Sequence, residues 1–538
     1  METLFSAVER LTAEAPDAIM FRDPTQVGVV ATTRTQFLDQ ARHFAATFAA
    51  HGVGEGDCVA SWLPNWSSTV AWQVAASAVG AHVVGINTRY NKTEVAHVLR
   101  KARPVVIGVA YEFQRLDLVG RARDALVEGG VDLPPPPAVL PIAAPGTELP
   151  ESTPTYDLGG GIWRLSDGDG FTATALAFSA ERLATAFTTS GSTGLPKLAA
   201  HTESGVLKHA LANAISCDFR PGDVFIAPLP FSGVFGFNAV WGALFGGASV
   251  LMHPVFDEER LLEDMARFGV THFVGADDML VRLKGAWEKA PADLGRWRVL
   301  LMADFLGRTP EIAAWADSEF GTVSMGVYGS SELFALAAHW RPETPLPRRW
   351  SGGGVPASDG IRIRLADPFD GTVLDQGDGE LQFRGHNVVD AYLGDEGEGA
   401  RAFTDDGWFR SGDLGRMTED GGFEFVCRAG DVLRLRGFLV EPAEVETRLA
   451  AHPAVEVAKV VGSIDASGEP VAVGFVTLAD GAEVREAELI GWCKDTLARF
   501  KVPHRILVID DMPTTAGTNG SKIKAGVLRD WASTALIS

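Results

Sequence analysis

The chain has 538 residues, more than one hydrophobic core usually supports, so its length predicts two or more domains. Its hydrophobic share of 46% and charged share of 22% are typical of a globular protein. The net charge of −22 argues against a general binder of nucleic acid or of anionic membranes, although it is compatible with a local basic pocket for an anionic substrate.

No stretch has the features of a targeting or membrane-spanning segment. Residues 1–10 lack a basic region followed by an apolar core. The most apolar window, residues 71–86, is interrupted by polar side chains and is shorter than the roughly 20 residues that cross a bilayer. The four cysteines lie far apart and have no metal-ligand spacing. We therefore expect a cytoplasmic protein with buried thiols, no membrane span and no nucleic-acid partner.

The first third of the chain alternates between helical and strand-like segments, which predicts α/β layers. Helices are expected at 35–52, 69–79 and 92–101, and strands at 59–63 and 105–110. Residues 133–161 contain a run of prolines and a run of glycines. We expect this segment to be an extended surface connection without catalytic residues.

The same alternation returns in the middle of the chain. Helices are expected at 204–215 and 258–268 and in a segment that ends at 244, and strands at 224–229, 249–252, 272–274, 299–302 and 323–327. Strands that alternate with helices usually pair in parallel, with both faces of the sheet covered. The adjacent residues Asp277 and Asp278 are expected to begin a helix.

The sequence pattern changes at residue 352, after which glycines are frequent and the apolar runs are short. Strands expected at 361–365, 379–384 and 422–426 predict a β-rich subdomain over residues 352–427. The tail alternates again, with helices expected at 442–451, 486–499 and 523–531 and strands at 472–478 and 505–509. The predicted fold is therefore multidomain α/β. A large N-terminal domain spans residues 1–429, and a small α+β domain spans residues 430–538.

A loop rich in hydroxyl groups and glycine is the first candidate site. Its residues are Thr188, Thr189, Ser190, Gly191, Ser192, Thr193, Gly194, Leu195, Pro196 and Lys197. Free backbone N–H groups, hydroxyl donors and one cation suit a polyphosphate, although the ending of the nucleotide P-loop is missing. The alternative is a flexible surface loop, against which Pro196 argues because it restricts one backbone dihedral. Composition alone leaves the two interpretations balanced.

Four later motifs follow this loop. They are Tyr328-Gly329-Ser330-Ser331-Glu332, Trp408-Phe409-Arg410-Ser411-Gly412-Asp413-Leu414, residues 428–446 and Asn519-Gly520-Ser521-Lys522-Ile523-Lys524. In this order and approximate spacing, the five motifs resemble the adenylate-forming superfamily, in particular AMP-forming acyl-CoA synthetases. The resemblance covers nearly the whole chain. Each motif alone is weak evidence, but the ordered set is specific.

The resemblance implies a reaction in two steps. A small-molecule carboxylic acid attacks the α-phosphate of ATP to give acyl-AMP and pyrophosphate, and the thiol of coenzyme A then takes the acyl group. Because the first step brings two anions together, it requires cations, Mg²⁺ and oriented N–H donors. ATP, Mg²⁺, coenzyme A and the acid are therefore the implied partners, and a homodimer is the assembly we consider.

The resemblance also assigns roles to the nucleotide motifs. The loop 188–197 would bind the β,γ-phosphates, and Tyr328 would stack on adenine, with Gly329 also in the nucleotide site. Ser331 would donate to phosphate, and Glu332 would hold Mg²⁺. Without the other motifs, this segment would be interpreted as a strand end running into a tight turn.

Two charged residues would complete the nucleotide site. Asp413 would accept hydrogen bonds from both ribose hydroxyls, a role that suits a group with only acceptor oxygens. Arg428 would add a cation nearby. The alternatives are a solvated turn residue and a surface ion pair.

The C-terminal domain would carry the remaining chemistry and would swing between the two steps about Gly430. Lys522 matches the adenylation lysine of the family, with Lys524 as the competing candidate and a solvated lysine as the plain alternative. We place Lys522 in a turn ahead of a helix. The binding and passage of coenzyme A would fall to Arg434, Arg436, Gly437 and Phe438.

The acid pocket would be walled by Phe231, Phe235, Gly236 and Phe237, although ordinary core packing explains each of these residues equally well. Three features depart from the family pattern. Gly430 stands where relatives usually carry a charged hinge residue, residues 302–305 replace a glycine-rich strip, and the histidine common near residue 231 is missing.

The leading hypothesis is an acyl-CoA ligase for an apolar acid, whether fatty, aromatic or polycyclic. Three alternatives stay open: a variant specialised for thioester formation from supplied acyl-AMP, a ligase that loads a carrier protein, and a non-catalytic binder of nucleotide or acyl-adenylate.

Overall fold

The structure is a computed structural model. It describes residues 2–25, 28–128, 133, 135–150, 157–169, 171–172, 181–189, 197–368, 370–429, 433–435, 438–440, 442–465, 468–499, 501–517 and 520–537. Within these ranges, no helix combines the length and the apolar character that crossing a membrane requires.

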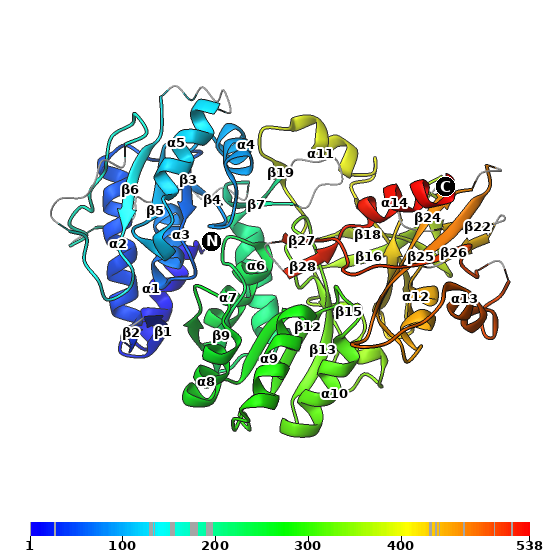
Figure 1. The fold of residues 1–538 in the computed structure, drawn as a ribbon. Helices are drawn as coiled ribbons and strands as arrows, with labels where there is room; N and C mark the ends of the chain where they lie inside the picture. The colour runs from blue at the N-terminus through cyan, green and yellow to red at the C-terminus, as the bar shows by residue number, and fades with distance from the viewer. Residues whose placement is uncertain are drawn as a thin grey trace.

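A seven-stranded sheet forms one layer of the N-terminal part (Figure 1). Its strand order is β19-β8-β7-β4-β3-β5-β6, parallel from β7 to β6 and antiparallel at β8 and β19. The strands are β3 (Cys58–Trp62), β4 (His82–Gly85), β5 (Val106–Ala110), β6 (Ala138–Ile142), β7 (Leu183–Thr188), β8 (Leu198–Thr202) and β19 (Ala391–Tyr392).

A second sheet of fourteen strands runs in the order β17-β16-β18-β20-β21-β15-β14-β13-β12-β11-β9-β10-β1-β2. Its parallel part contains β1 (Ile19–Thr25), β9 (Val224–Ala227), β10 (Ser249–Met252), β11 (His272–Ala276), β12 (Val299–Ala303) and β13 (Val323–Tyr328), with β2 (Gly28–Thr33) antiparallel at the edge. The antiparallel remainder contains β14 (Ala338–His339), β15 (Gly353–Pro356), β16 (Arg362–Ala366), β17 (Val373–Leu374), β18 (Asp378–Arg384), β20 (Phe409–Met417) and β21 (Phe423–Arg428).

Helices cover and separate the two sheets. They are α1 (Leu4–Glu14), α2 (Arg34–Ala50), α3 (Ser67–Val79), α4 (Lys92–Ala102), α5 (Leu118–Glu128), α6 (Glu203–Ser216), α7 (Val234–Phe245), α8 (Glu258–Phe268), α9 (Asp277–Lys289), α10 (Thr309–Phe320) and the short α11 (Glu396–Ala402), with 3₁₀ turns at Phe113–Arg115 and Arg348–Trp350. Every residue of α3 is buried, as is every residue of α7 before Phe245. A helix that is apolar on all sides belongs inside a protein, and α3 contacts strands of both sheets.

A buried ion pair attaches the first helix to this core. Arg182 and Glu203 pair with side chains only 4% and 2% exposed. The Glu203 carboxylate also accepts hydrogen bonds from the Ser77 hydroxyl and, at 2.9 Å, from the backbone N–H of Leu4. The pair therefore connects the start of α1 to α3 and to the start of α6.

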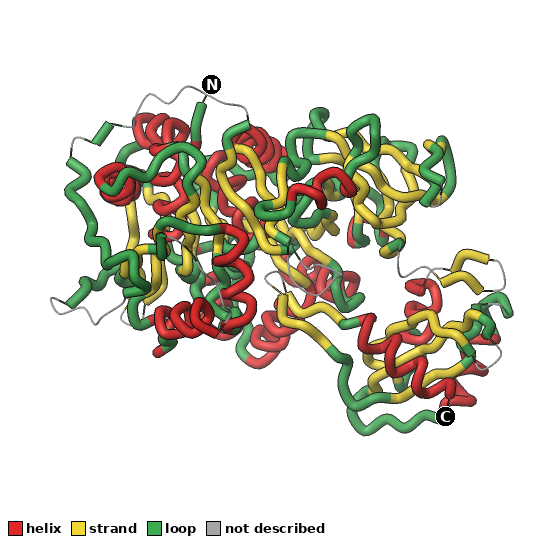
Figure 2. Tube along the Cα trace, turned by 90° about the horizontal axis from the view of Figure 1, so that it is seen from above, coloured by secondary structure: helices red, strands yellow, loops and turns green. Residues whose placement is uncertain are grey.

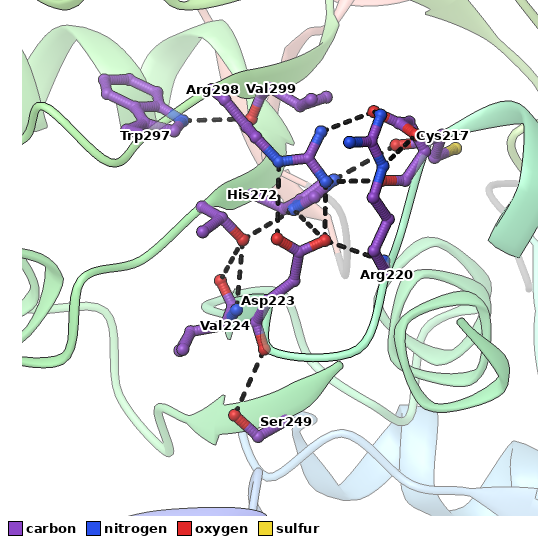
Figure 3. A network of polar contacts seen from close by, with 11 residues as sticks. Cys217, Arg220, Asp223, Val224, Ser249, His272, Trp297, Arg298 and Val299 are labelled. Carbon is purple, nitrogen blue, oxygen red and sulfur yellow. Dashed lines mark hydrogen bonds and ion pairs between the residues drawn. The ribbon is translucent and has the colours of Figure 1, made fainter. Parts of the chain in front are cut away.

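A second charged network joins the N-terminal ends of β9, β11 and β12 (Figure 3). Arg298 binds Asp223 and Asp218, each with a nitrogen–oxygen distance of 2.6 Å. His272 Nε2 lies 3.2 Å from the backbone oxygen of Cys217, and burial lowers the pKa of this imidazole to about 4. Because these strands are parallel, the network lies at the sheet edge opposite to their carboxyl ends.

The C-terminal part has its own cores and stands apart as a lobe (Figure 2). Its sheet contains β24 (Val455–Ile464), β25 (Pro470–Leu478) and β26 (Arg505–Val508), and its helices are α12 (Pro442–Ala450), α13 (Glu486–Lys494) and α14 (Ala525–Ile537). Two hairpins accompany them, β22 (Leu433–Leu435) with β23 (Phe438–Val440), and β27 (Thr514–Gly517) with β28 (Gly520–Ile523). The predicted fold class, multidomain α/β with a large N-terminal and a small C-terminal part, is confirmed.

Three local predictions were wrong. The surface connection predicted at 133–161 contains β6, a fully buried strand at the end of the sheet order, where Pro141 is tolerated because an edge strand has one unpaired side. The turn predicted around Lys522 is strand β28. The helix predicted over 486–499 ends at Lys494.

Candidate active site

Two segments predicted to bind nucleotide meet where β7 and β13 end. Thr188 is the last residue of β7, and Tyr328 is the last residue of β13. Just beyond Tyr328, the Ser331 hydroxyl donates to the backbone oxygen of Thr188 at 3.3 Å. The carboxyl ends of parallel strands are where open α/β sheets bind ligands. The contact therefore joins residues 143 positions apart at the carboxyl ends of two strands from different sheets, a place suited to a ligand.

The two ends of the predicted phosphate loop are held together. The backbone N–H of Thr189 donates to the carbonyl oxygen of Lys197 at 2.9 Å. The Lys197 ammonium lies 5.6 Å from the ring centre of Tyr392, within the range of a cation–π contact. The hydroxyl oxygens of Thr188 and Tyr90 are 2.6 Å apart. Ser190, Gly191, Ser192, Thr193 and Gly194 lie outside the described residues.

Tyr90 did not stand out in the sequence. It immediately precedes Asn91, the N-cap of α4, and nothing in its local pattern indicates that it reaches the end of β7. Only the packing of α4 against β8 makes the contact predictable.

Tyr328, Asp413 and Arg428 form a connected group. The Tyr328 hydroxyl donates to Asp413 Oδ2 at 2.6 Å, and Arg428 Nε lies 2.9 Å from Asp413 Oδ1. Asp413 on β20 and Arg428 on β21 are direct cross-strand partners. Burial, reinforced by the negative charge of Asp413, raises the pKa of Tyr328 well above its ordinary value, so this phenol stays protonated as a donor.

The Tyr328 ring is held by aromatic neighbours. It lies nearly parallel to Phe383, with ring centres 5.6 Å apart, and edge-on to Phe423 at 5.0 Å. These contacts orient the phenol toward Asp413. Phe383 and Phe423 belong to strands of the β-rich segment, so the antiparallel part of the large sheet positions the end of β13.

The segment after Tyr328 turns sharply. A Cβ atom at Gly329 would lie 2.7 Å from the Cα of Ala335, a distance that side chains essentially never show, so glycine is required there. Ser331 and Glu332 are half-buried. The backbone oxygen of Glu332 accepts a hydrogen bond from the Val389 N–H at 2.7 Å. The backbone of this segment is therefore fixed while the Glu332 side chain keeps access to solvent.

Three consecutive residues beyond Glu332 adopt left-handed backbone conformations. Phe334, Ala335 and Leu336 have φ values of +58°, +48° and +39°, and all three are buried. Such conformations in residues other than glycine cost of order 1–3 kcal/mol each, and they cluster at functional sites. No local sequence signal predicted this turn, since none of the three residues is glycine or asparagine.

A carboxyl pair lies at the ends of β11 and β12. Asp277 begins α9, as predicted, and accepts hydrogen bonds from the backbone N–H groups of Leu306 at 2.8 Å and Arg308 at 3.1 Å. Asp304 has an exposed side, yet packing around its carboxyl group and the charge of Asp277 raise its pKa to about 7.

The predicted acid-pocket aromatics pack in the core. Phe237 is 1% exposed, and its ring centre lies 4.8 Å from that of Phe231 and 5.9 Å from that of Phe334. Phe235 is buried beside them, and a Cβ atom at Gly236 would lie 2.5 Å from the Pro230 oxygen. The cavity against Phe231 and Phe237 measures about 10 Å³, room for about one water.

The C-terminal candidates are placed in part. Lys522 lies on β28 opposite Thr515, and β28 contacts α9, the helix that begins at Asp277. Lys524 follows the hairpin and is exposed. Arg434 and Phe438 lie on hairpin β22–β23, while Gly430, Arg436 and Gly437 are outside the described residues.

Comparison with known proteins places this geometry in a family. The model of the AMP-binding enzyme family matches residues 8–393, and the model of the AMP-binding enzyme C-terminal domain matches residues 444–518. The chain belongs to the AMP-binding enzyme family. The resemblance to adenylate-forming enzymes predicted from the five motifs is thereby confirmed.

The AMP-binding enzyme has curated relatives along its full length. It is 28% identical to the 3-(7a-methyl-1,5-dioxo-octahydro-1H-inden-4-yl)propanoyl:CoA ligase of Rhodococcus jostii (strain RHA1), covering 98% of each chain. It is also 28% identical to the medium-chain fatty-acid–CoA ligase of Escherichia coli (strain K12), covering 94% of this chain and 88% of that one. Among solved structures, ATP-bound MatB from Rhodopseudomonas palustris superposes with a TM-score of 0.81 at 23% identity, covering 99% of each chain. That likeness establishes the shared fold.

Proposed function

We propose that this AMP-binding enzyme is an acyl-CoA ligase that activates an apolar carboxylic acid as acyl-AMP and transfers the acyl group to coenzyme A. The observation that carries the proposal is the Tyr328–Asp413–Arg428 group beside the Ser331–Thr188 contact. It joins a carboxylate suited to a ribose and a hydroxyl donor, both from the fourteen-stranded sheet, to the end of β7 in the seven-stranded sheet. The names of the relatives, CoA ligases for polycyclic and fatty acids, support this choice of reaction.

Asp413 suits the ribose for a physical reason. A carboxylate offers about four acceptor positions and no donor. This one, 5% exposed, accepts from Tyr328 on one oxygen and pairs with Arg428 on the other. The two ribose hydroxyls would donate to these same oxygens. Arg428, whose side chain is 56% exposed, would stay beside the bound nucleotide as a cation.

The residues present also fit Mg²⁺. This hard cation prefers carboxylate oxygens and is usually held by one or two carboxylates together with substrate phosphates. Glu332 would hold it, because its backbone is fixed and it is half-buried directly after Ser331, whose hydroxyl binds Thr188. The ion would neutralise phosphate charge as the carboxylate approaches. Ser331, Thr189 and Lys197 would bind the phosphates directly.

The C-terminal domain, residues 430–538, would alternate between the two steps. Hairpin β27–β28 carries Lys522 and contacts α9 of the N-terminal part, a placement that supports delivery of this lysine for adenylation. Hairpin β22–β23, with Arg434 and Phe438, would take its place for the thiol step, with Gly430 as the hinge.

An acid panel tests the proposal. Fatty, aromatic and polycyclic acids are each incubated with ATP, Mg²⁺ and coenzyme A, while pyrophosphate release and thioester formation are scored separately. We expect both products with at least one apolar acid. Thioester formation only from supplied acyl-AMP would instead identify a thioester-forming specialist. ATP binding with neither product would identify a non-catalytic binder, and preferential transfer to a carrier protein would exclude coenzyme A as the acceptor.

A further inference from the structure

The carbonyl oxygens of residues 331–335 each accept a hydrogen bond from a donor that is distant in the sequence. His201 Nε2 on β8 donates to the Ser331 oxygen at 2.7 Å. The next four oxygens accept from the Val389 N–H at 2.7 Å, Asn387 Nδ2 at 3.0 Å, Asn238 Nδ2 at 3.0 Å and His209 Nε2 at 2.8 Å, in the order Glu332, Leu333, Phe334 and Ala335. The backbone of residues 331–335 is therefore fixed by hydrogen bonds from other parts of the protein.

Two of these donors hold the left-handed turn itself. Asn238 on α7 and His209 on α6 are both fully buried, and they bind the oxygens of Phe334 and Ala335. Asn238 Nδ2 also lies 3.4 Å from the Ala335 oxygen. A turn made of residues that disfavour left-handed conformations persists only where its surroundings over-determine it. His209 and Asn238 supply that constraint.

The imidazole acts here as a neutral donor. Burial lowers the pKa of His209 to about 3, so the ring is uncharged at neutral pH. Because its Nε2 faces a carbonyl oxygen, that nitrogen carries the proton. His386 and His201 are the titratable groups that act on His209, and burial lowers the pKa of each of these two imidazoles to about 4. The donor therefore does not change its protonation across the neutral pH range.

The turn is coupled to the site through a short backbone path. Leu333 N and Ala335 N both donate to the Ser330 oxygen, at 3.3 Å and 2.9 Å, so the turn folds back on the residue just before Ser331. The Cα of Ala335 also occupies the space that a side chain at position 329 would need. A shift of the turn must therefore move Ser331 and Glu332.

We propose that His209 and Asn238 are positioning residues for the adenylation step, which hold the 334–336 turn and through it set the placement of Ser331 and Glu332. This role rests on the proposed function, because it assumes that Ser331 and Glu332 bind ATP and its metal ion. Thioester formation from acyl-AMP uses no ATP and releases no pyrophosphate. The role therefore predicts a loss confined to the first half-reaction.

The test uses His209→Phe and Asn238→Leu in the full chain, with His209→Gln as the variant that keeps an N–H donor. We expect kcat for pyrophosphate-forming adenylation to fall about 10- to 100-fold in the first two, as expected for a displacement of about 1 Å at a reacting centre. The apparent Mg²⁺ requirement should rise. Thioester formation from supplied acyl-AMP should change less than about threefold, and His209→Gln should recover most of the adenylation rate.

Two matched controls separate positioning from plain destabilisation. His272→Phe removes an equally buried imidazole whose Nε2 also binds a backbone oxygen, but at the opposite edge of the sheet (Figure 3). Asn213→Ala removes an equally buried amide on α6 that donates to the His209 oxygen and not to the turn. Both should lower the melting temperature and change the two half-reactions in equal proportion.

Amide hydrogen exchange supplies a readout that does not depend on turnover. Peptides covering residues 329–336 should exchange faster in His209→Phe and Asn238→Leu and not in the controls. Unchanged exchange, or equal losses in both half-reactions, would overturn the positioning role while the wild-type enzyme remains an acyl-CoA ligase. A wild-type chain that forms no acyl-AMP with any acid would instead overturn the proposed function and the adenylation role together.

Discussion

Replacing Asp413 with asparagine should weaken ATP use more than it weakens the fold. The Tyr328–Asp413 bond of 2.6 Å joins two groups that are 7% and 5% exposed, so it contributes as a buried charge-assisted hydrogen bond. The Arg428 side chain is 56% exposed, and solvent screening limits its ion pair to below about 1 kcal/mol. Because the asparagine oxygen still accepts from Tyr328, we expect the free energy of unfolding to fall by about 1–2 kcal/mol.

The loss of free energy should be larger for the interaction with ATP. An asparagine presents a donor where one ribose hydroxyl requires an acceptor, and it removes the charge from the other bond. Hydrogen bonds to charged groups contribute about 1.5–3 kcal/mol each, so a loss of about 2–3 kcal/mol lowers kcat/KM for ATP about 30- to 160-fold.

The assay compares Asp413→Asn, Tyr328→Phe and the double variant, with kcat/KM for ATP and denaturant unfolding measured on each. Tyr328→Phe removes the internal hydrogen bond and leaves the carboxylate in place. Stability should therefore show a coupling energy of about 1 kcal/mol between the two positions, whereas ATP use should depend mainly on Asp413. An Asp413→Asn enzyme with unchanged kcat/KM for ATP would refute the assignment of this carboxylate to the ribose.

Three further predictions concern other parts of the chain. Lys522→Ala should abolish acyl-AMP formation and spare the transfer of the acyl group from supplied acyl-AMP to coenzyme A. Equal losses in the two assays would show that Lys522 is not the adenylation lysine. The raised pKa of Asp304 means that the folded protein binds this proton more tightly than the unfolded chain, so stability is lost as pH rises from about 4 to about 7. Asp304→Asn should therefore gain stability relative to wild type between pH 5 and pH 8, and parallel denaturation curves would contradict this. Glu203→Ala leaves the buried Arg182 guanidinium without its carboxylate and should cost about 3–5 kcal/mol in denaturant unfolding, against less than about 1 kcal/mol for removal of an exposed glutamate.

Local signals predicted helices well. The predicted helix over residues 258–268 matches α8, because Asp257 caps its first turn and Gly269 ends it in a left-handed conformation. The start of α9 at Asp277 was also predicted, although its N-cap is Ala276 and no side chain caps it. Helix-end signals act within three or four residues, so they can be recognised without knowledge of the rest of the chain.

Strand β6 and hairpin β27–β28 were misassigned for the opposite reason. Proline and glycine near these segments indicate turns locally, whereas pairing with a distant strand or with a hairpin partner decides the outcome. A strand is stabilised by packing against neighbouring strands, and its own sequence does not show which strands these are.

The functional groups of the candidate site could be predicted from the sequence, but their arrangement in space could not. Five motifs carried the hydroxyls, carboxylates and lysine of an adenylate-forming enzyme, and side-chain chemistry alone indicates what such groups can bind. Only the fold brought Tyr328 within 2.6 Å of Asp413, 85 residues away, and only the fold placed His209 and Asn238 against the left-handed turn. The physical reason is that a residue's chemistry is a local property, whereas strand order and buried donors decide which groups meet and which strained backbone is held.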